Sequence, residues 1–213
     1  MAGLGNPGPR YERTRHNAGF MVIDELAARS RAAGRLLPDA WVAEASLGGA
    51  PALLVKPLSY MNLSGEPVER LLAEAGASAA DLVVVVDDVA LPLGRLRVRE
   101  RGSDGGHNGL RSIAAALGSS DFARIRIGVG PDPGSDQANP AEPIAPQDSP
   151  EGDRVTSSTS KPVQDLSEFV LAEFLAGELP RLHEVIGLAA DAVACLAESG
   201  TAAAMNRFNG PRT

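Results

Sequence analysis

The clearest indication of the fold class is the sequence Leu82-Val83-Val84-Val85-Val86-Asp87-Asp88. Its five consecutive apolar residues, four of them β-branched, are typical of a strand buried on both faces. Strands of this kind belong to parallel sheets that helices cover on both sides. We therefore expect a central strand here, with Asp87 and Asp88 following its carboxyl end.

Helical and strand-like segments alternate along the rest of the chain. Short strands are expected at 52–55, 95–101 and 123–129, and helices at 17–33, from Ser64 to Gly76, at 108–117, 165–176 and 179–198. Such alternation predicts an α/β fold. We expect a single domain over residues 1–213, with a twisted, mostly parallel mixed sheet flanked by helices.

Residues 132–163 differ in composition from their surroundings. The stretch from Pro131 to Gln164 holds seven of the sixteen prolines, no aromatic residue and the polar run Thr156-Ser157-Ser158-Thr159-Ser160. It has too little apolar surface to offset the entropy of ordering. Only about 48 residues of helical pattern follow it, which is small for an independent domain. We expect a disordered, Pro/Ser-rich acidic insertion within the domain.

Composition excludes several classes of protein. No apolar run approaches the roughly 20 residues that cross a bilayer, and the first residues do not form a secretory signal, so we expect a cytoplasmic protein without a membrane partner. The single cysteine, Cys195, excludes an internal disulfide, and three scattered histidines show no metal-ligand spacing. Neither a nucleophile elbow nor a phosphate-binding Gly-Lys-Ser/Thr motif is present.

The net charge of −7 hides one basic region. Residues 95–126 hold seven arginines against three acidic residues. Within them Arg95, Arg97, Arg99 and Arg101 alternate with other residues, which places four guanidinium groups on one face of a strand. Arg124 and Arg126 repeat the pattern on the next strand. Such a row suits phosphate groups, although a solvated strand face explains it about equally well.

Five polar side chains lie where an open α/β sheet binds ligands. His16 directly precedes the first expected helix, and its ordinary pKa near 6.5 suits a general base. Asp87 follows the central strand and could orient that base. Asn6, Asn62 and Asn108 stand in turn-like settings and offer amide donors and acceptors. Each alone is a routine turn or capping residue; together they indicate a catalytic site.

The motif Gly3-Leu4-Gly5-Asn6-Pro7-Gly8 has the glycine spacing of dinucleotide-binding proteins. Pro7 and Pro9 occupy the positions where such a fold begins its helix, and the acidic residue at suitable spacing, Asp24, falls inside a helix. We discount this match; addition of NAD with no thermal shift would dispose of the alternative.

Several blocks together resemble the bacterial-type peptidyl-tRNA hydrolase family. Besides the motif at residues 3–8 they are Tyr11 with residues 14–19, residues 56–65 (Lys-Pro-Leu-Ser-Tyr-Met-Asn-Leu-Ser-Gly), 86–88, 105–112 (Gly-Gly-His-Asn-Gly-Leu-Arg-Ser) and 122–130. The stretch Phe169–Phe174 and Met205-Asn206-Arg207 also fit. The blocks stand in the family's order and span the chain apart from the insertion. The resemblance implies a monomeric esterase without cofactor or metal that cleaves peptidyl-tRNA into tRNA and peptide.

The resemblance also implies roles for individual residues. His16 would activate water, Asp87 would hold His16 in the productive tautomer, and Asn6, Asn62 and Asn108 would position peptide, ester and water. Met61 and Tyr11 would line the cleft, and Arg99 and Arg126 would bind tRNA phosphates.

Three features depart from the family pattern. Only Met1-Ala2 precede Gly3 where the family has a central apolar strand, so we expect unpaired sheet neighbours and a poorly anchored Asn6. The insertion replaces a short loop, and Arg101 and Asp104 stand in a loop that is usually richer in glycine. A non-catalytic RNA-binding relative, similar to some splicing cofactors, and an unstable product of a truncated frame remain as alternatives to the enzyme.

Overall fold

A computed structural model describes residues 1–131 and 166–210. Within these residues seven strands form one sheet in the order β2-β3-β4-β1-β5-β7-β6. The strands β4, β1, β5 and β7 run parallel to one another, whereas β2, β3 and β6 add antiparallel edges. Their bounds are β1 (Ala2–Gly3), β2 (Gly34–Leu36), β3 (Ala40–Leu47), β4 (Ala50–Pro57), β5 (Val83–Pro92), β6 (Leu96–Arg99) and β7 (Ala123–Gly130).

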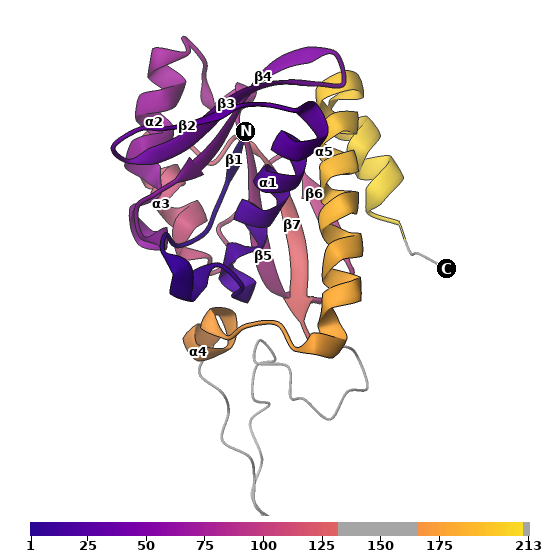
Figure 1. Cartoon of the computed structure of the whole chain (residues 1–213). Coiled ribbons are helices and arrows are strands. Elements are labelled where there is room, and N and C mark those ends of the chain that lie inside the picture. Colours follow the sequence, from indigo (N-terminus) through magenta and orange to yellow (C-terminus); the bar gives the residue numbers. More distant parts are fainter. Residues whose placement is uncertain (132–165, 211–213) are drawn as a thin grey trace, which may run out of the picture.

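Helices cover both faces of the sheet (Figure 1). One layer contains α1 and α5, the other contains α2 and α3, and α4 lies beyond the ends of the strands. The bounds are α1 (Ala18–Ser30), α2 (Gly65–Glu74), α3 (Asn108–Leu117), α4 (Leu166–Leu171) and α5 (Leu179–Phe208). The predicted α/β class, with a parallel centre and helices on both faces, is confirmed.

The central strand β5 is buried on both faces, as its composition predicts. Val83 and Val85 pack into the core below α1 and α5, while Val84 and Val86 pack into the second core below α2 and α3. Val84, Val85 and Val86 have no exposed surface. The strand therefore separates two apolar cores, which explains why its apolar run is continuous rather than alternating.

The first strand is short but paired on both sides. Ala2 pairs with Val55 of β4 and Val84 of β5, and the backbone N–H of Leu4 continues the ladder to the carbonyl of Val85. The predicted loss of pairing is thus wrong. Gly3 and Gly19 make the close approach of α1 to this strand possible, because a Cβ on Gly19 would lie 2.4 Å from the backbone nitrogen of Leu4.

Other expectations need correction at the element level. The strands β2 and β3 were not predicted, because Gly34 directly follows the expected helix at 17–33 and residues 40–47 do not alternate strictly between apolar and polar residues. The α4 helix ends at Leu171, sooner than expected, and α5 extends to Phe208 through a kink at Gly200 (φ 83°). The predicted insertion at 132–163 lies outside the described residues.

One helix also bears on the membrane prediction. Among the described residues, the segment Ala176–Phe208 is long and apolar enough to cross a membrane by length and composition. Charged and polar residues interrupt this segment, so it contains no long uninterrupted apolar run. Val185, Ala189 and Val193 on this helix pack into the core shared with the sheet and α1, the place of a core helix in this fold.

Candidate active site

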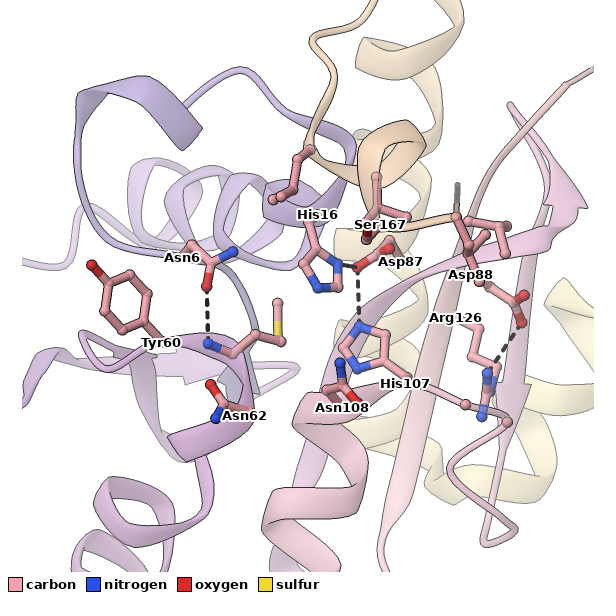
Figure 2. Close-up of a pocket in the computed structure, with 17 residues that line it drawn as sticks. Asn6, His16, Tyr60, Asn62, Asp87, Asp88, His107, Asn108, Arg126 and Ser167 are labelled. Carbon is pink, nitrogen blue, oxygen red and sulfur yellow. Dashed lines mark hydrogen bonds and ion pairs between the residues drawn. The ribbon is translucent and has the colours of Figure 1, made fainter. Parts of the chain in front are cut away.

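A pocket of about 520 Å³ opens beside the carboxyl end of β1 (Figure 2). The predicted residues that line it are Asn6, His16, Met61, Asn62, Asp87, Asn108 and Arg126. They come from segments far apart in the chain: the turn after β1, the 3-10 helix before α1, the turn before α2, β5, β7 and the start of α3.

Asp87 lies within β5 rather than after its end. The strand continues to Pro92, and Asp87 pairs in register with Ile127 of β7. On the other side, β1 reaches only the level of Val85. The ligand-binding edge is therefore created by the early end of β1, which leaves room beside Asp87 for His16 and Asn6.

His16 and Asp87 form the central pair of the pocket. The Nδ1 atom of His16 lies 2.9 Å from Oδ1 of Asp87, and the two side chains are 12% and 3% exposed. Burial alone would raise the pKa of Asp87, but the charges and hydrogen bonds of His16 and His107 hold that pKa well below its usual range. Asp87 is therefore a carboxylate, which accepts the Nδ1 proton of His16 and leaves Nε2 unprotonated when the ring is neutral.

The pKa of His16 reflects two opposed effects. Burial lowers it, whereas the charge of Asp87 and the hydrogen bond to Asp87 raise it, and the net result lies above the ordinary value. The second ring nitrogen of His16 faces the open space between Asn6 and His107 (Figure 2). This geometry suits a general base that works near neutral pH.

His107 is the second histidine on Asp87, and its role was not predicted from the sequence. Its Nε2 lies 3.1 Å from the same Oδ1 atom of Asp87. Its Nδ1 accepts the backbone N–H groups of Gly109 and Leu110 at the start of α3. Because Nδ1 is an acceptor, the proton must reside on Nε2, and both nitrogens are occupied. His107 therefore orients Asp87 and cannot itself take a proton from water.

The same bonds bear on metal binding. His16, Asp87 and His107 could offer three ligand atoms that lie within 4.8 Å of one another. A metal-binding histidine normally donates its other N–H to an acceptor. Here the other nitrogen of His107 faces two N–H donors. The three side chains therefore suit an arrangement in which each histidine donates one N–H to Oδ1 of Asp87. This arrangement fits them better than a shared metal ion.

Asn6 is held in one orientation. Its Oδ1 accepts the backbone N–H of Met61 at 2.9 Å, and its backbone exchanges two hydrogen bonds with the side chain of Asn17. The predicted poor anchoring of Asn6 is wrong, because these contacts do not depend on a long first strand. With Oδ1 occupied, the amide nitrogen is directed into the pocket as a donor, on the side of His16 (Figure 2).

Comparison with known proteins identifies the family of this chain. A sequence profile described as peptidyl-tRNA hydrolase matches residues 1–142. The peptidyl-tRNA hydrolase of Kosmotoga olearia is 41% identical over 208 residues, covering 97% of this chain and 95% of its own. That of Thermotoga petrophila is also 41% identical, covering 98% and 96%. The chain belongs to the peptidyl-tRNA hydrolase family.

A solved structure shows the same fold. The crystal structure of peptidyl-tRNA hydrolase from Acinetobacter baumannii superimposes with a TM-score of 0.78 at 28% identity, covering 99% of this chain and 94% of that chain. The fold and family implied by the sequence resemblance are thus confirmed.

Two residues that the peptidyl-tRNA hydrolase resemblance placed at the site lie outside the residues that line the pocket. Tyr11 sits on the turn Pro9–Tyr11, where the guanidinium of Arg10 covers its ring. Tyr60, 56% exposed, lines the pocket instead. Arg99 is exposed on the edge strand β6. Asn62 and Asn108 do line the pocket, and both are exposed to solvent.

The predicted arginine row is only partly present. Register places Arg97 opposite Arg126 and Arg99 opposite Arg124, so these four share a face, while Arg95 and Arg101 lie outside β6.

Arg124 is 1% exposed and donates to the carbonyls of Gly102, Ser103, Ser120 and Phe122. Burial lowers its pKa. Arg124 therefore holds loops together and does not face phosphates.

Arg126 lines the pocket but is also engaged. One nitrogen lies 3.3 Å from Asp88, and the other donates to the carbonyls of Ser103 and Asp104 at 3.0 Å. These carbonyls belong to the loop that leads into Gly105, Gly106 and His107. Arg126 thus connects the site to the loop that carries the second histidine.

Sequence reasoning missed the wall that α4 contributes. Leu166, Ser167, Val170 and Leu171 line the pocket, although α4 lies some 80 residues after Asp87 in the chain. Val89, Gly105 and Gly106 were also not predicted. Only His107 had a readable signal, because a histidine between a Gly-Gly turn and a helix is well placed to cap that helix.

Proposed function

We propose that this protein hydrolyses the ester bond of peptidyl-tRNA, with His16 as the general base and Asp87 as the residue that orients it. The observation that carries the proposal is the His16–Asp87 hydrogen bond of 2.9 Å, which leaves Nε2 of His16 facing the pocket beside the amide of Asn6. Membership of the peptidyl-tRNA hydrolase family supplies the substrate class.

In the proposed reaction, Nε2 of His16 takes a proton from water, and the water oxygen attacks the ester carbonyl carbon. Asp87 stabilises the imidazolium that forms, and His107 keeps Asp87 in place through the second hydrogen bond to Oδ1. The ester bond then breaks, and the ribose oxygen leaves with the proton that His16 returns. The products are a peptide carboxylic acid, which releases its proton to solvent, and a tRNA with a free terminal hydroxyl.

Negative charge develops on the carbonyl oxygen during the attack. The amide nitrogen of Asn6 is the donor placed to receive it, because its Oδ1 is already held by Met61. A prepositioned donor of this kind is typically worth about 3 kcal/mol of barrier. Asn62 and Asn108 would hold the peptide and the water on the opposite side of the pocket.

The tRNA would lie along the face that carries Arg99 and Arg126. Their strands β6 and β7 are adjacent, and Arg126 reaches the pocket rim. Guanidinium groups at that position suit the phosphates near the esterified end. We further propose that the protein acts as a monomer in the cytoplasm, where translation takes place, with no cofactor.

The test is single-turnover hydrolysis of an N-blocked aminoacyl-tRNA by the unaltered chain beside His16→Ala. We expect cleavage that is lost, by about 10²-fold or more, in the variant. Circular dichroism of both proteins controls for folding. A folded chain that binds the tRNA without cleaving it would contradict the enzyme and favour an RNA-binding relative.

A further inference from the structure

The α4 helix forms an apolar wall next to the polar centre of the pocket. Leu166, Val170 and Leu171 line the pocket from this helix, and Leu166 and Leu171 remain 42% and 41% exposed. Tyr60 and Met61 line the pocket from the turn before α2. The site therefore has exposed apolar surface that the chemistry of His16, Asp87 and Asn6 does not use.

The α4 segment is held against the site through Arg15, the residue directly before His16. Nη1 of Arg15 donates to the carbonyls of Ala172 and Glu173 just after α4, at 3.3 and 2.7 Å. Nη2 of Arg15 donates hydrogen bonds to both carboxylate oxygens of Glu178, at 3.0 and 2.8 Å. The guanidinium also lies over the rings of Phe169 and Phe174, at 4.6 and 5.2 Å.

These contacts are buried and converge on one segment. The side chain of Arg15 is only 4% exposed. In the part of the chain that the structure describes, the acceptors that it reaches all lie between residues 172 and 178. The backbone adds the Thr14–Glu173 bridge and the bond from Arg15 N–H to the Ala172 carbonyl. Removal of the guanidinium would leave Glu178 and two carbonyls without this partner, which is costly in a buried place.

We propose that Arg15 is a positioning residue that seats α4 as a wall of the pocket, and that this wall binds an apolar side chain of the peptide esterified to tRNA. The inference rests on the proposed function. It follows that Arg15 acts on substrate binding and selectivity, whereas its neighbour His16 acts on the chemical step.

The substrate is a single tRNA, chemically acylated with either N-acetylphenylalanine or N-acetylaspartate, so that only the side chain differs. The unaltered protein is expected to show the lower KM with the phenylalanine ester. In Arg15→Gln we expect KM for that ester to rise about tenfold. KM for the aspartate ester and kcat for both esters should change less than about twofold. The pH at which kcat falls should stay the same. Arg13→Gln, an exposed arginine on the same turn, is the matched control.

Two further variants keep the test decisive if Arg15→Gln is unstable. Glu178→Gln removes the carboxylate partner, and Leu171→Asn alters the wall directly; both should raise KM for the phenylalanine ester selectively. Equal losses with both esters, or a shifted pH profile, would overturn the inference, because Arg15 would then act through His16. Hydrolysis of neither ester by the unaltered protein would overturn the proposed function itself, and this outcome is visible before any variant is made.

Discussion

At the scale of single residues, one carboxylate oxygen organises the site. Oδ1 of Asp87 meets both His16 and His107, yet the two histidines differ in what their other nitrogen does. The second nitrogen of His107 is held by two backbone N–H groups, while that of His16 faces the pocket. The two rings are chemically identical, so only their hydrogen bonds distinguish them. These bonds leave His16 free to act as the base and make His107 a residue that orients Asp87.

Asp87→Asn should lower turnover by about 10²- to 10⁴-fold, because the amide neither fixes the tautomer of His16 nor stabilises its charged form. It should also change the pH profile. The reaction needs neutral His16, so in the unaltered protein the rate falls as pH drops through its raised pKa. Without the charge of Asp87, burial remains and lowers that pKa, so the acid limb should move to lower pH. Single-turnover rates across pH check this; an unmoved limb would contradict it.

Arg99 and Arg126 should differ in their response to salt. Arg99 is exposed, and the described residues form no ion pair with it. Arg99→Gln should therefore mainly reduce the slope of log kcat/KM against log salt concentration. The expected reduction is about 0.7–0.9 for the loss of one phosphate contact. Arg126→Gln should reduce the slope and also lower kcat, because Arg126 holds the loop before His107. A lower kcat with an unchanged slope would remove Arg126 from the phosphate contacts.

At the scale of elements, the site depends on how closely α1 approaches β1. Because α1 begins directly against the first strand, His16 reaches the pocket and Asn17 reaches the backbone of Asn6. Glycines make this contact possible: a Cβ on Gly3 would lie 2.2 Å from the carbonyl oxygen of Gly19. Gly3 and Gly5 of the first motif therefore allow close packing of α1 on this strand, whereas Gly8 (φ 106°) provides a positive φ in the following turn.

Gly19→Ala should destabilise the protein by at least about 2 kcal/mol, because the new Cβ would meet backbone atoms of Leu4 and Val85 at 2.4 Å. The melting temperature should fall by about 4–8 °C. Gly187→Ala on α5 is the control, since its Cβ would meet only the flexible end of Arg29, at 3.3 Å. Calorimetry of both variants tests this; equal melting temperatures would mean that α1 can shift away from β1 at little cost.

At the scale of the whole molecule, the described parts of the chain supply every residue of the proposed chemistry. The pocket is lined from residues 6–126 and 166–171. Deletion of residues 135–160 should therefore leave kcat within about twofold, since no group named in the mechanism is removed. Single-turnover hydrolysis, with circular dichroism to verify folding, is the measurement. A large loss of turnover in a folded variant would show that the insertion touches the substrate.

The α/β class, the burial of both faces of β5 and most of the polar residues at the pocket can be predicted from the sequence alone. These features depend on short runs of sequence or on family motifs. A continuous apolar run indicates burial on both faces of a strand. The blocks around Asn6, His16 and Asp87 are each a short uninterrupted run of residues. Tertiary structure decided the rest. Arg124 is buried and binds loop carbonyls, and His107 binds Asp87. Arg15 holds α4 in place as a wall of the pocket. Each depends on contacts between distant segments, and residue type and spacing do not specify which carbonyls or carboxylates a side chain will reach.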